Sequence, residues 1–276
     1  VIILANAISI GTVALVSRAV GAGDFGRALD VARQSLLLGG AVAVALTLVG
    51  YLFAREIVAA VGFPEEIREI AGTFLRIFSL GLGAEYMLII SNAVFRAGGD
   101  VRAALLTMFF ASVLNVAGDF LLVFGLPGVP GLGYPGIAIA TAISAALGMG
   151  TSFFLFFRGR WRSLYRGSWA ARPATIRQIT GLGWPSAMLQ IAWNAGTVVL
   201  YNILGRLGDY SITALAAIAN GLRIEAVIFL PAFALNMSAS VLIGQNLGAG
   251  EPGRAERVGW RIAAAGALVL SAMAVV

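Results

Sequence analysis

Residues 21–28 read Gly-Ala-Gly-Asp-Phe-Gly-Arg-Ala, and residues 248–255 read Gly-Ala-Gly-Glu-Pro-Gly-Arg-Ala. The two segments lie 227 positions apart, and the match continues upstream, where Ala14-Leu15-Val16 corresponds to Val241-Leu242-Ile243. Each copy ends an apolar stretch and opens a short charged segment. In a membrane protein, a long repeat of this kind indicates two structurally related halves, which usually flank a central site.

The composition is that of a membrane protein. Hydrophobic residues make up 59% of the chain and charged residues 12%, and the mean hydropathy is +0.92. A soluble domain carries about 25% charged residues and has no means of burying so many apolar side chains. Several apolar stretches exceed the roughly 20 residues that a helix needs to cross a bilayer. The fold class that we expect is therefore an all-α polytopic membrane protein.

The 276 residues contain no cysteine and no histidine. Thiol chemistry, disulfides and Cys-ligated metals are thereby excluded, and the commonest general base is missing. The net charge of +6 is spread over the loops instead of forming a patch that would bind nucleic acid. We expect no enzymatic activity, no cofactor and no nucleic-acid partner. The expected partners are the lipid bilayer and a small-molecule substrate, and the expected state is a monomer.

Apolar runs and helix-ending residues predict eight helices. Their approximate ranges are 1–16, 31–54, 67–95, 101–124, 137–157, 174–204, 212–243 and 254 onward. Residues 18–30 are expected to form a loop, and so are residues 125–131, because two prolines among glycines cannot continue a helix. Residues 158–172, rich in Arg and Trp, are expected to form the longest polar connection.

The positions of the arginines orient these helices. All nineteen basic residues are arginines, and fourteen of them lie at one set of alternate loops, against three, Arg55, Arg68 and Arg206, at the opposite set. Loops rich in basic residues remain in the cytoplasm, so both Gly-Ala-Gly segments are predicted to be cytoplasmic. Six spans, an even number, separate the two segments. The halves are therefore expected to be parallel repeats, related by an axis along the membrane normal.

The length of the repeat predicts a larger protein. Two units of 227 residues need about 454 residues, whereas this chain has 276 and both begins and ends inside an apolar run. We expect a fragment of a multi-pass protein of a prokaryotic plasma (inner) membrane. Its two lobes would have six helices each, and the second would be incomplete here. A first helix is expected before Val1. With a cytoplasmic N-terminus, an inside-to-outside span must come before the outside-to-inside span that ends at the first Gly-Ala-Gly segment.

Three acidic residues, Glu85, Asp119 and Glu225, lie well inside predicted spans, away from the helix ends. A charge at the bilayer centre costs roughly 2.5–3.5 kcal/mol on insertion scales, so such residues are expected to face the protein interior. Asp119 follows Asn115 by four residues, which puts both on one helix face, and Thr141 of the next helix can add a hydroxyl. A carboxylate with an amide oxygen suits Na⁺, and a desolvated carboxylate can carry a proton instead. The alternative is that Asp119 only hydrogen-bonds a neighbouring helix.

Five further segments carry a family resemblance through their order and spacing. They are Thr12 to Gly23 with its copy Ser240 to Gly250, Phe95-Arg96-Ala97-Gly98-Gly99-Asp100, Asn115 to Gly125, Gly136 to Ser144, and Gly183-Trp184-Pro185-Ser186. Each motif is loose on its own. Together they make the chain, over essentially its whole length, similar to the multidrug and toxic compound extrusion (MATE) transporters.

The resemblance implies twelve helices in two six-helix lobes. Residues 1–157 would form the N-lobe from helix two to helix six, residues 158–172 a cytoplasmic linker between the lobes, and residues 173–276 the first part of the C-lobe, helices seven to nine. It also implies a secondary active antiporter that exports amphipathic or cationic small molecules, such as drugs, toxins and metabolites, in exchange for Na⁺ or H⁺.

The resemblance also implies where the coupling cation binds. In one prokaryotic branch the N-lobe site uses an Asn and an Asp of helix five and a Thr of helix six, which correspond to Asn115, Asp119 and Thr141; the partner Asp of helix one would precede Val1. Another branch uses a Glu in helix seven, but residues 190–194 contain no acid, which favours the N-lobe site. Gln190 and Asn194 in that stretch are candidate substrate contacts. No metal is expected beyond a possible Na⁺ at Asp119.

Two alternatives remain open at the level of sequence. A flippase of lipid-linked oligosaccharide precursors belongs to the same wider superfamily, but it needs a basic cavity. The candidate basic residues deep inside the spans are Arg76 and Arg223. An intramembrane enzyme would need a nucleophile–base pair, and a scaffold is not excluded.

Overall fold

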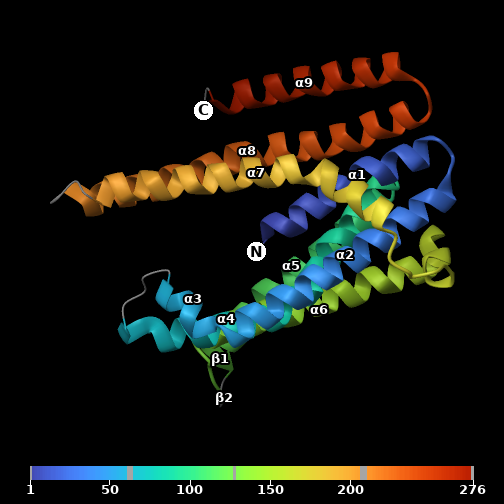
Figure 1. The fold of residues 1–276 in the computed structure, drawn as a ribbon. Coiled ribbons are helices and arrows are strands. Elements are labelled where there is room, and N and C mark those ends of the chain that lie inside the picture. Colours follow the sequence, from blue (N-terminus) through green and yellow to red (C-terminus); the bar gives the residue numbers. More distant parts are fainter. Residues whose placement is uncertain (1, 61–64, 127–128, 206–209, 275–276) are drawn as a thin grey trace.

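The computed structural model describes residues 2–60, 65–126, 129–205 and 210–274, and these are almost entirely helical (Figure 1). The elements are α1 (Ile2–Gly21), α2 (Phe25–Leu52), α3 (Ala54–Ala60), α4 (Glu65–Ala97), α5 (Val101–Phe124), α6 (Tyr134–Arg158), a 3₁₀ helix η1 (Arg160–Arg166), α7 (Pro173–Gly205), α8 (Ser211–Gly248) and α9 (Pro252–Ala274). Two short strands, β1 (Gly125–Leu126) and β2 (Val129–Pro130), pair antiparallel within the predicted 125–131 loop. The all-α class is confirmed.

Seven of the described helices are long and apolar enough to cross a membrane: α1, α2, α4, α5, α6, α7 and α8. In the bilayer interior, a continuous helix satisfies every backbone polar group internally, and this is why long apolar runs become unbroken helices. The helix α9 is not among the seven, and its first ten residues include three arginines and a glutamate. The chain is thus a multi-pass membrane protein. Arg206, one of the three arginines assigned to the opposite side, lies outside the described residues.

Three pairs of helices are joined by the same tight turn. In each turn a glycine has a positive φ, and the residue after it donates its backbone N–H to a carbonyl five residues earlier. The glycines are Gly23 (φ 73°), Gly99 (φ 83°) and Gly250 (φ 75°). The corresponding bonds run from Asp24 to Ala19, from Asp100 to Phe95 and from Glu251 to Asn246, each at 2.9 Å. This is the Schellman ending of a helix, which needs a left-handed residue that glycine adopts at no steric cost.

The predicted loop over residues 18–30 is wrong. The helix α1 continues to Gly21 and α2 begins at Phe25, so that only residues 22–24 connect them. Asp24 explains the short connection, because its side chain accepts a hydrogen bond from the backbone N–H of Arg27 at 2.8 Å and caps the new helix at once. Charged residues within 18–30 therefore belong to helix ends.

The helices form two groups that meet at one end. The N-terminal group contains α2 to α6, the C-terminal group contains α7 to α9, and α1 packs against both. The three turns at residues 22–24, 98–100 and 249–251 lie where the groups meet, which we call the glycine-turn end. Figure 1 shows that α7 and α8 run away from the N-terminal group toward the side on which α3 and the β1–β2 hairpin lie, which we call the hairpin end.

The two copies of the repeat lie together at the glycine-turn end, since Gly21 of α1 abuts Gln245 of α8. Six helices with span-like length, α2 to α8 without the short α3, connect them. This confirms that the repeats are parallel, because inverted repeats would place the two copies at opposite ends.

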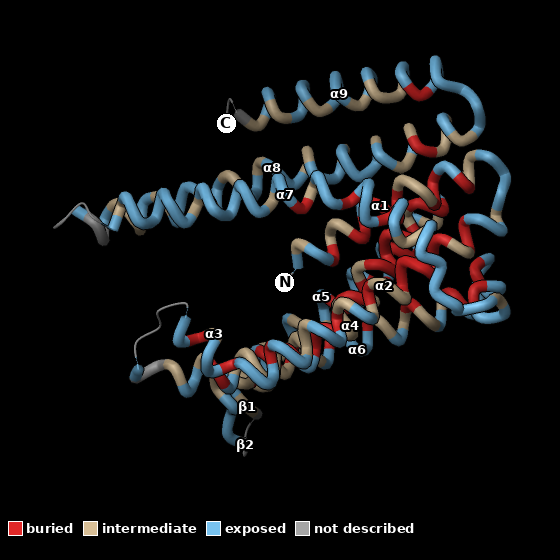
Figure 2. Tube along the Cα trace, viewed as in Figure 1, coloured by how far each residue is buried: buried red, intermediate tan, exposed pale blue. Residues whose placement is uncertain are grey.

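The buried core is concentrated at the glycine-turn end (Figure 2). It consists mainly of residues from α1, α2 and α4, together with Phe156 and Trp161. In α7, the buried residues are Ile179, Gly183 and Ala187, all in the first half of the helix. In α8, Gly244 is the buried residue among those described. The two groups therefore share a packed core at one end only.

The connection between the groups folds back on the N-terminal group. The sequence predicted a polar connection over residues 158–172, and the structure adds the helix η1, whose Trp161 is fully buried against Phe25 and Phe156. Arg33 of α2 donates to the carbonyls of Leu164 (2.9 Å) and Ser163 (3.0 Å). The connection is thus held by side chains of α2, which the sequence alone did not indicate.

Candidate functional site

Asn115 of α5 and Thr141 of α6 lie in contact. The amide nitrogen of Asn115 donates to the hydroxyl of Thr141 at 3.3 Å, and that hydroxyl donates to the carbonyl of Ile137 at 2.9 Å. Because the single hydroxyl proton goes to Ile137, the Thr141 oxygen must accept from Asn115. The carbonyl oxygen of the Asn115 amide is therefore oriented away from this bond and remains able to bind a cation.

Asp119 lies one helical turn beyond Asn115, on the same face of α5. Its side chain is half-buried, and its Oδ1 atom is buried without a hydrogen-bond partner among the described residues. Leaving a buried polar atom unpaired costs about 1–3 kcal/mol, and more for a charged group. A bound cation would supply a partner for this oxygen, and a proton would remove the charge of the carboxylate. The orphaned oxygen is the feature that marks this place as a candidate cation site.

Close packing holds α5 against α6 at this level. A Cβ atom at Gly118 would lie 3.1 Å from the Cβ of Ala140, so the two backbones approach as only small residues allow. Among the described residues, no group of three acidic side chains could hold a metal ion. A cation at Asp119 would thus rely on one carboxylate with an amide and a hydroxyl oxygen, a set suited to a hard monovalent cation or a proton.

Gln190 makes a polar contact between α7 of the C-terminal group and α1. Its Oε1 atom accepts a hydrogen bond from the side-chain amide of Asn6 in α1 at 3.3 Å. Asn194 is exposed and donates back to the carbonyl of Gln190 at 2.7 Å, within its own helix. Gln190 follows the last buried residue of α7, Ala187, so the pair lies where the two groups begin to separate.

Asn6 was not among the predicted site residues. It is the one side-chain amide in the apolar helix α1. Burying an unpaired amide in a membrane is costly, and this was the available sign that Asn6 needs a partner. The identity of that partner, 184 positions away, could come only from the fold.

The acids Glu85 and Glu225 lie elsewhere. Both are half-buried, Glu85 on α4 of the N-terminal group and Glu225 on α8 of the C-terminal group. Arg76 of α4 lies over the ring of Tyr51 of α2, with 6.0 Å between its guanidinium carbon and the ring centroid. These residues do not join the Asn115–Thr141 pair in any described contact.

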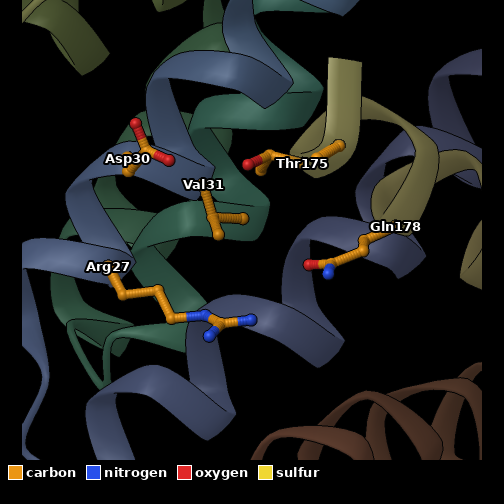
Figure 3. A pocket seen from close by; sticks show the side chains of 6 residues that line it. Arg27, Asp30, Val31, Thr175 and Gln178 are labelled. Atoms are coloured by element: carbon orange, nitrogen blue, oxygen red, sulfur yellow. The ribbon is translucent and has the colours of Figure 1, made fainter. Parts of the chain in front are cut away.

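A recess of about 270 Å³ lies at the glycine-turn end, between α2 and α7 (Figure 3). Arg27 and Asp30 of α2 and Thr175 and Gln178 of α7 point toward one another across it. Asp30 is bound on one side by Arg172, at 3.0 Å. The recess lies where the connection enters α7, and none of the candidate cation ligands lines it.

The chain is similar to known proteins both through a family model and through individual relatives. The MatE family model matches residues 1–121 and 185–276. The chain is 26% identical over 244 residues to a probable multidrug resistance protein NorM of Thermotoga maritima, covering 88% of this chain and 52% of the relative. It is 28% identical over 263 residues to an FAD transporter of Shewanella oneidensis, covering 93% of this chain and 57% of the relative.

The fold matches a solved structure as well. A crystal structure of MATE in the straight conformation superimposes with a TM-score of 0.80 at 22% identity, covering 97% of this chain and 59% of that one. At this identity the likeness concerns the fold. The chain spans about half the length of the curated relatives that it matches.

Proposed function

This chain belongs to the MatE family, and from that premise we propose that the complete protein is a secondary active antiporter that exports small molecules in exchange for Na⁺ or H⁺. The proposed substrates are amphipathic or cationic compounds, in keeping with the relative named as a multidrug resistance protein. Because another relative is named as an FAD transporter, FAD is a second compound to be tested as a substrate.

The single observation that carries the coupling is the orphaned carboxylate oxygen of Asp119 beside the Asn115–Thr141 pair. Binding of Na⁺ or a proton neutralises this carboxylate and removes the free-energy cost of keeping its charge away from water. A cation that binds one conformation of the N-terminal group better than another shifts the equilibrium between them, typically by about 1–3 kcal/mol. That shift is the proposed link between cation entry and substrate release.

The arrangement of the two groups supports alternating access. They share a core at the glycine-turn end and separate toward the hairpin end, past the Asn6–Gln190 contact. We propose that residues 1–157 and 173–276 act as two lobes joined by the connection 158–172, and that substrate binds between them near Gln190 and Asn194. The arginines at the glycine-turn end, Arg18, Arg27 and Arg254 among them, support its placement in the cytoplasm.

The test is dye efflux from proteoliposomes that contain the complete protein, driven by an imposed Na⁺ or H⁺ gradient. The wild type is expected to export an ethidium-like dye with at least one of the gradients. Asp119→Asn replaces the carboxylate by a neutral amide of the same size, and gradient-driven efflux is expected to be abolished. Glu56→Gln, the same chemical change at an exposed residue of α3, serves as the control and is expected to retain efflux. Efflux at the wild-type rate in Asp119→Asn would exclude this site from coupling.

A further inference from the structure

The helices α1 and α8 touch through equivalent positions of the two repeats. Gly21 lies against the backbone carbonyl of Gln245, and Gly248 lies against the backbone carbonyl of Arg18. With the repeat offset of 227, Arg18 corresponds to Gln245 and Gly21 corresponds to Gly248. Each repeat therefore offers the same glycine to the same carbonyl of the other, as in a two-fold symmetric interface.

A third pair of equivalent positions lies inside this contact. Gly244 of α8 faces the side chain of Ser17 in α1, and these positions are again 227 residues apart. A side chain at Gly21, Gly244 or Gly248 would overlap atoms of the other helix. Ser17 is fully buried beneath the contact. Such backbone-to-backbone packing of small residues is the closest approach that two membrane helices make.

The side chain of Gln245 extends the contact to a third helix. Its Nε2 atom donates a hydrogen bond of 3.1 Å to the carbonyl of Ala97, the last residue of α4. None of the backbone N–H groups in the turn at residues 98–100 donates to this carbonyl. The last carbonyls of a helix have no donor within the helix and need one from elsewhere, which Gln245 supplies here. The equivalent residue of the first repeat, Arg18, is exposed, so the side-chain bond exists only on the C-terminal side.

We propose that Gln245 is a positioning residue that holds the two groups together at the glycine-turn end, an arrangement that we call the latch. The latch builds on the close contact of α1 and α8 at Ser17, Gly21, Gly244 and Gly248. The backbone contact makes the closed arrangement compact, and the Gln245–Ala97 bond ties it to the turn between α4 and α5. Opening of this end must break that bond. The link between the latch and transport rests on the proposed function, whereas the latch itself concerns only the conformational equilibrium.

The test reads the exposure of Ser17. Because the chain has no cysteine, Ser17→Cys introduces one thiol in this region, nearly isosteric with the serine and covered by Gly244. The labelling rate with a maleimide is measured on the complete protein in detergent, without substrate or added coupling ion. Gln245→Glu keeps the shape of the side chain but replaces the donor by an acceptor, which repels the Ala97 carbonyl. We expect Gln245→Glu to increase the labelling rate about 2- to 10-fold, the range for loss of one net hydrogen bond.

Two controls separate opening from general loosening. Asn246→Asp makes the same chemical change one residue later, where the amide bonds only within its own helix, to Leu242 at 2.7 Å. It is expected to leave the Ser17→Cys rate unchanged. Ser152→Cys reports on a fully buried site of α6 within the N-terminal group. Its rate is expected to remain low with Gln245→Glu.

An equal Ser17→Cys rate with and without Gln245→Glu would overturn the latch. So would a parallel rise at Ser152→Cys, since the substitution would then loosen the whole fold. The uncharged Gln245→Met, which also lacks the donor, is expected to raise the rate too, and no rise there would show that the introduced charge caused the effect and overturn the hydrogen bond as the cause. Because labelling needs no transport, a failure here is distinct from a failure of gradient-driven efflux.

Discussion

The glycine-turn end and the hairpin end of the molecule are held together in different ways. At the glycine-turn end, backbones of α1 and α8 touch, and large side chains such as Trp161 and Phe95 are fully buried. Toward the hairpin end, α7 has no buried residue among those described beyond Ala187. The same helices thus pass from a tight core to a region where the two groups are apart (Figure 2). Among the described residues, the two groups are therefore joined at one end, and the proposed alternating access rests on this arrangement.

The largest effect is expected from emptying the core at the joined end. Trp161→Ala removes a fully buried indole that packs against Phe25 and Phe156 and abuts Gly98. Loss of such a side chain costs about 3–5 kcal/mol, so the thermal midpoint of the complete protein in detergent should fall sharply. Trp169→Ala, on the exposed part of the same connection, is the control and is expected to change the midpoint little. Equal shifts for the two tryptophans would show that the connection does not stabilise this end.

A smaller effect is expected from the helix contact itself. Gly248→Ala adds one methyl group where the Arg18 carbonyl already lies, and overpacking of this kind costs about 1–3 kcal/mol. Gly253→Ala makes the same change in open space five residues later and is expected to be neutral or slightly stabilising, because Ala favours helix. Thermal unfolding of both variants measures the difference. A tolerated Gly248→Ala would mean that α1 and α8 are not in contact there.

The smallest effect is expected where the groups begin to part. The Asn6–Gln190 hydrogen bond should contribute about 0.6 kcal/mol, the average for polar pairs between membrane helices. A double-mutant cycle with Asn6→Ala and Gln190→Ala, read by unfolding free energy, measures the coupling. A cycle with Asn6→Ala and Asn194→Ala is the control and should give none, because Asn194 bonds within α7. Equal coupling in both cycles would contradict the contact.

Much of the fold followed from the sequence for physical reasons that can be named. Apolar runs of bilayer length become helices because no other backbone arrangement is satisfied there, and the doubled segment fixed the parallel relation of the halves. The turns were placed too broadly. Asp24 stands between two helices, and its role as a cap depends on Gly23 adopting a positive φ, which spacing alone does not indicate.

The candidate site was predicted in part. Asn115 and Asp119 share a helix face through their spacing. Thr141 was predicted as a hydroxyl of the next helix, and the structure places it in contact with Asn115. Asn6 and Gln245 were not predicted as contacts, because their partners lie 184 and 148 positions away. Such pairs depend on how whole helices cross, and no local pattern encodes that crossing.

The cation site is tested most directly by ion-dependent stability of the complete protein in detergent. A ligand that binds only the folded state stabilises it by about 2.7 kcal/mol at a concentration 100 times its Kd. Thermal midpoints are measured against Na⁺ at fixed pH, and against pH without Na⁺, for the wild type, Asp119→Asn and Glu56→Gln. The stability of the wild type and Glu56→Gln is expected to respond to Na⁺ or to pH to an extent that Asp119→Asn lacks. Curves for Asp119→Asn that coincide with the wild type against both ions would contradict cation binding at Asp119.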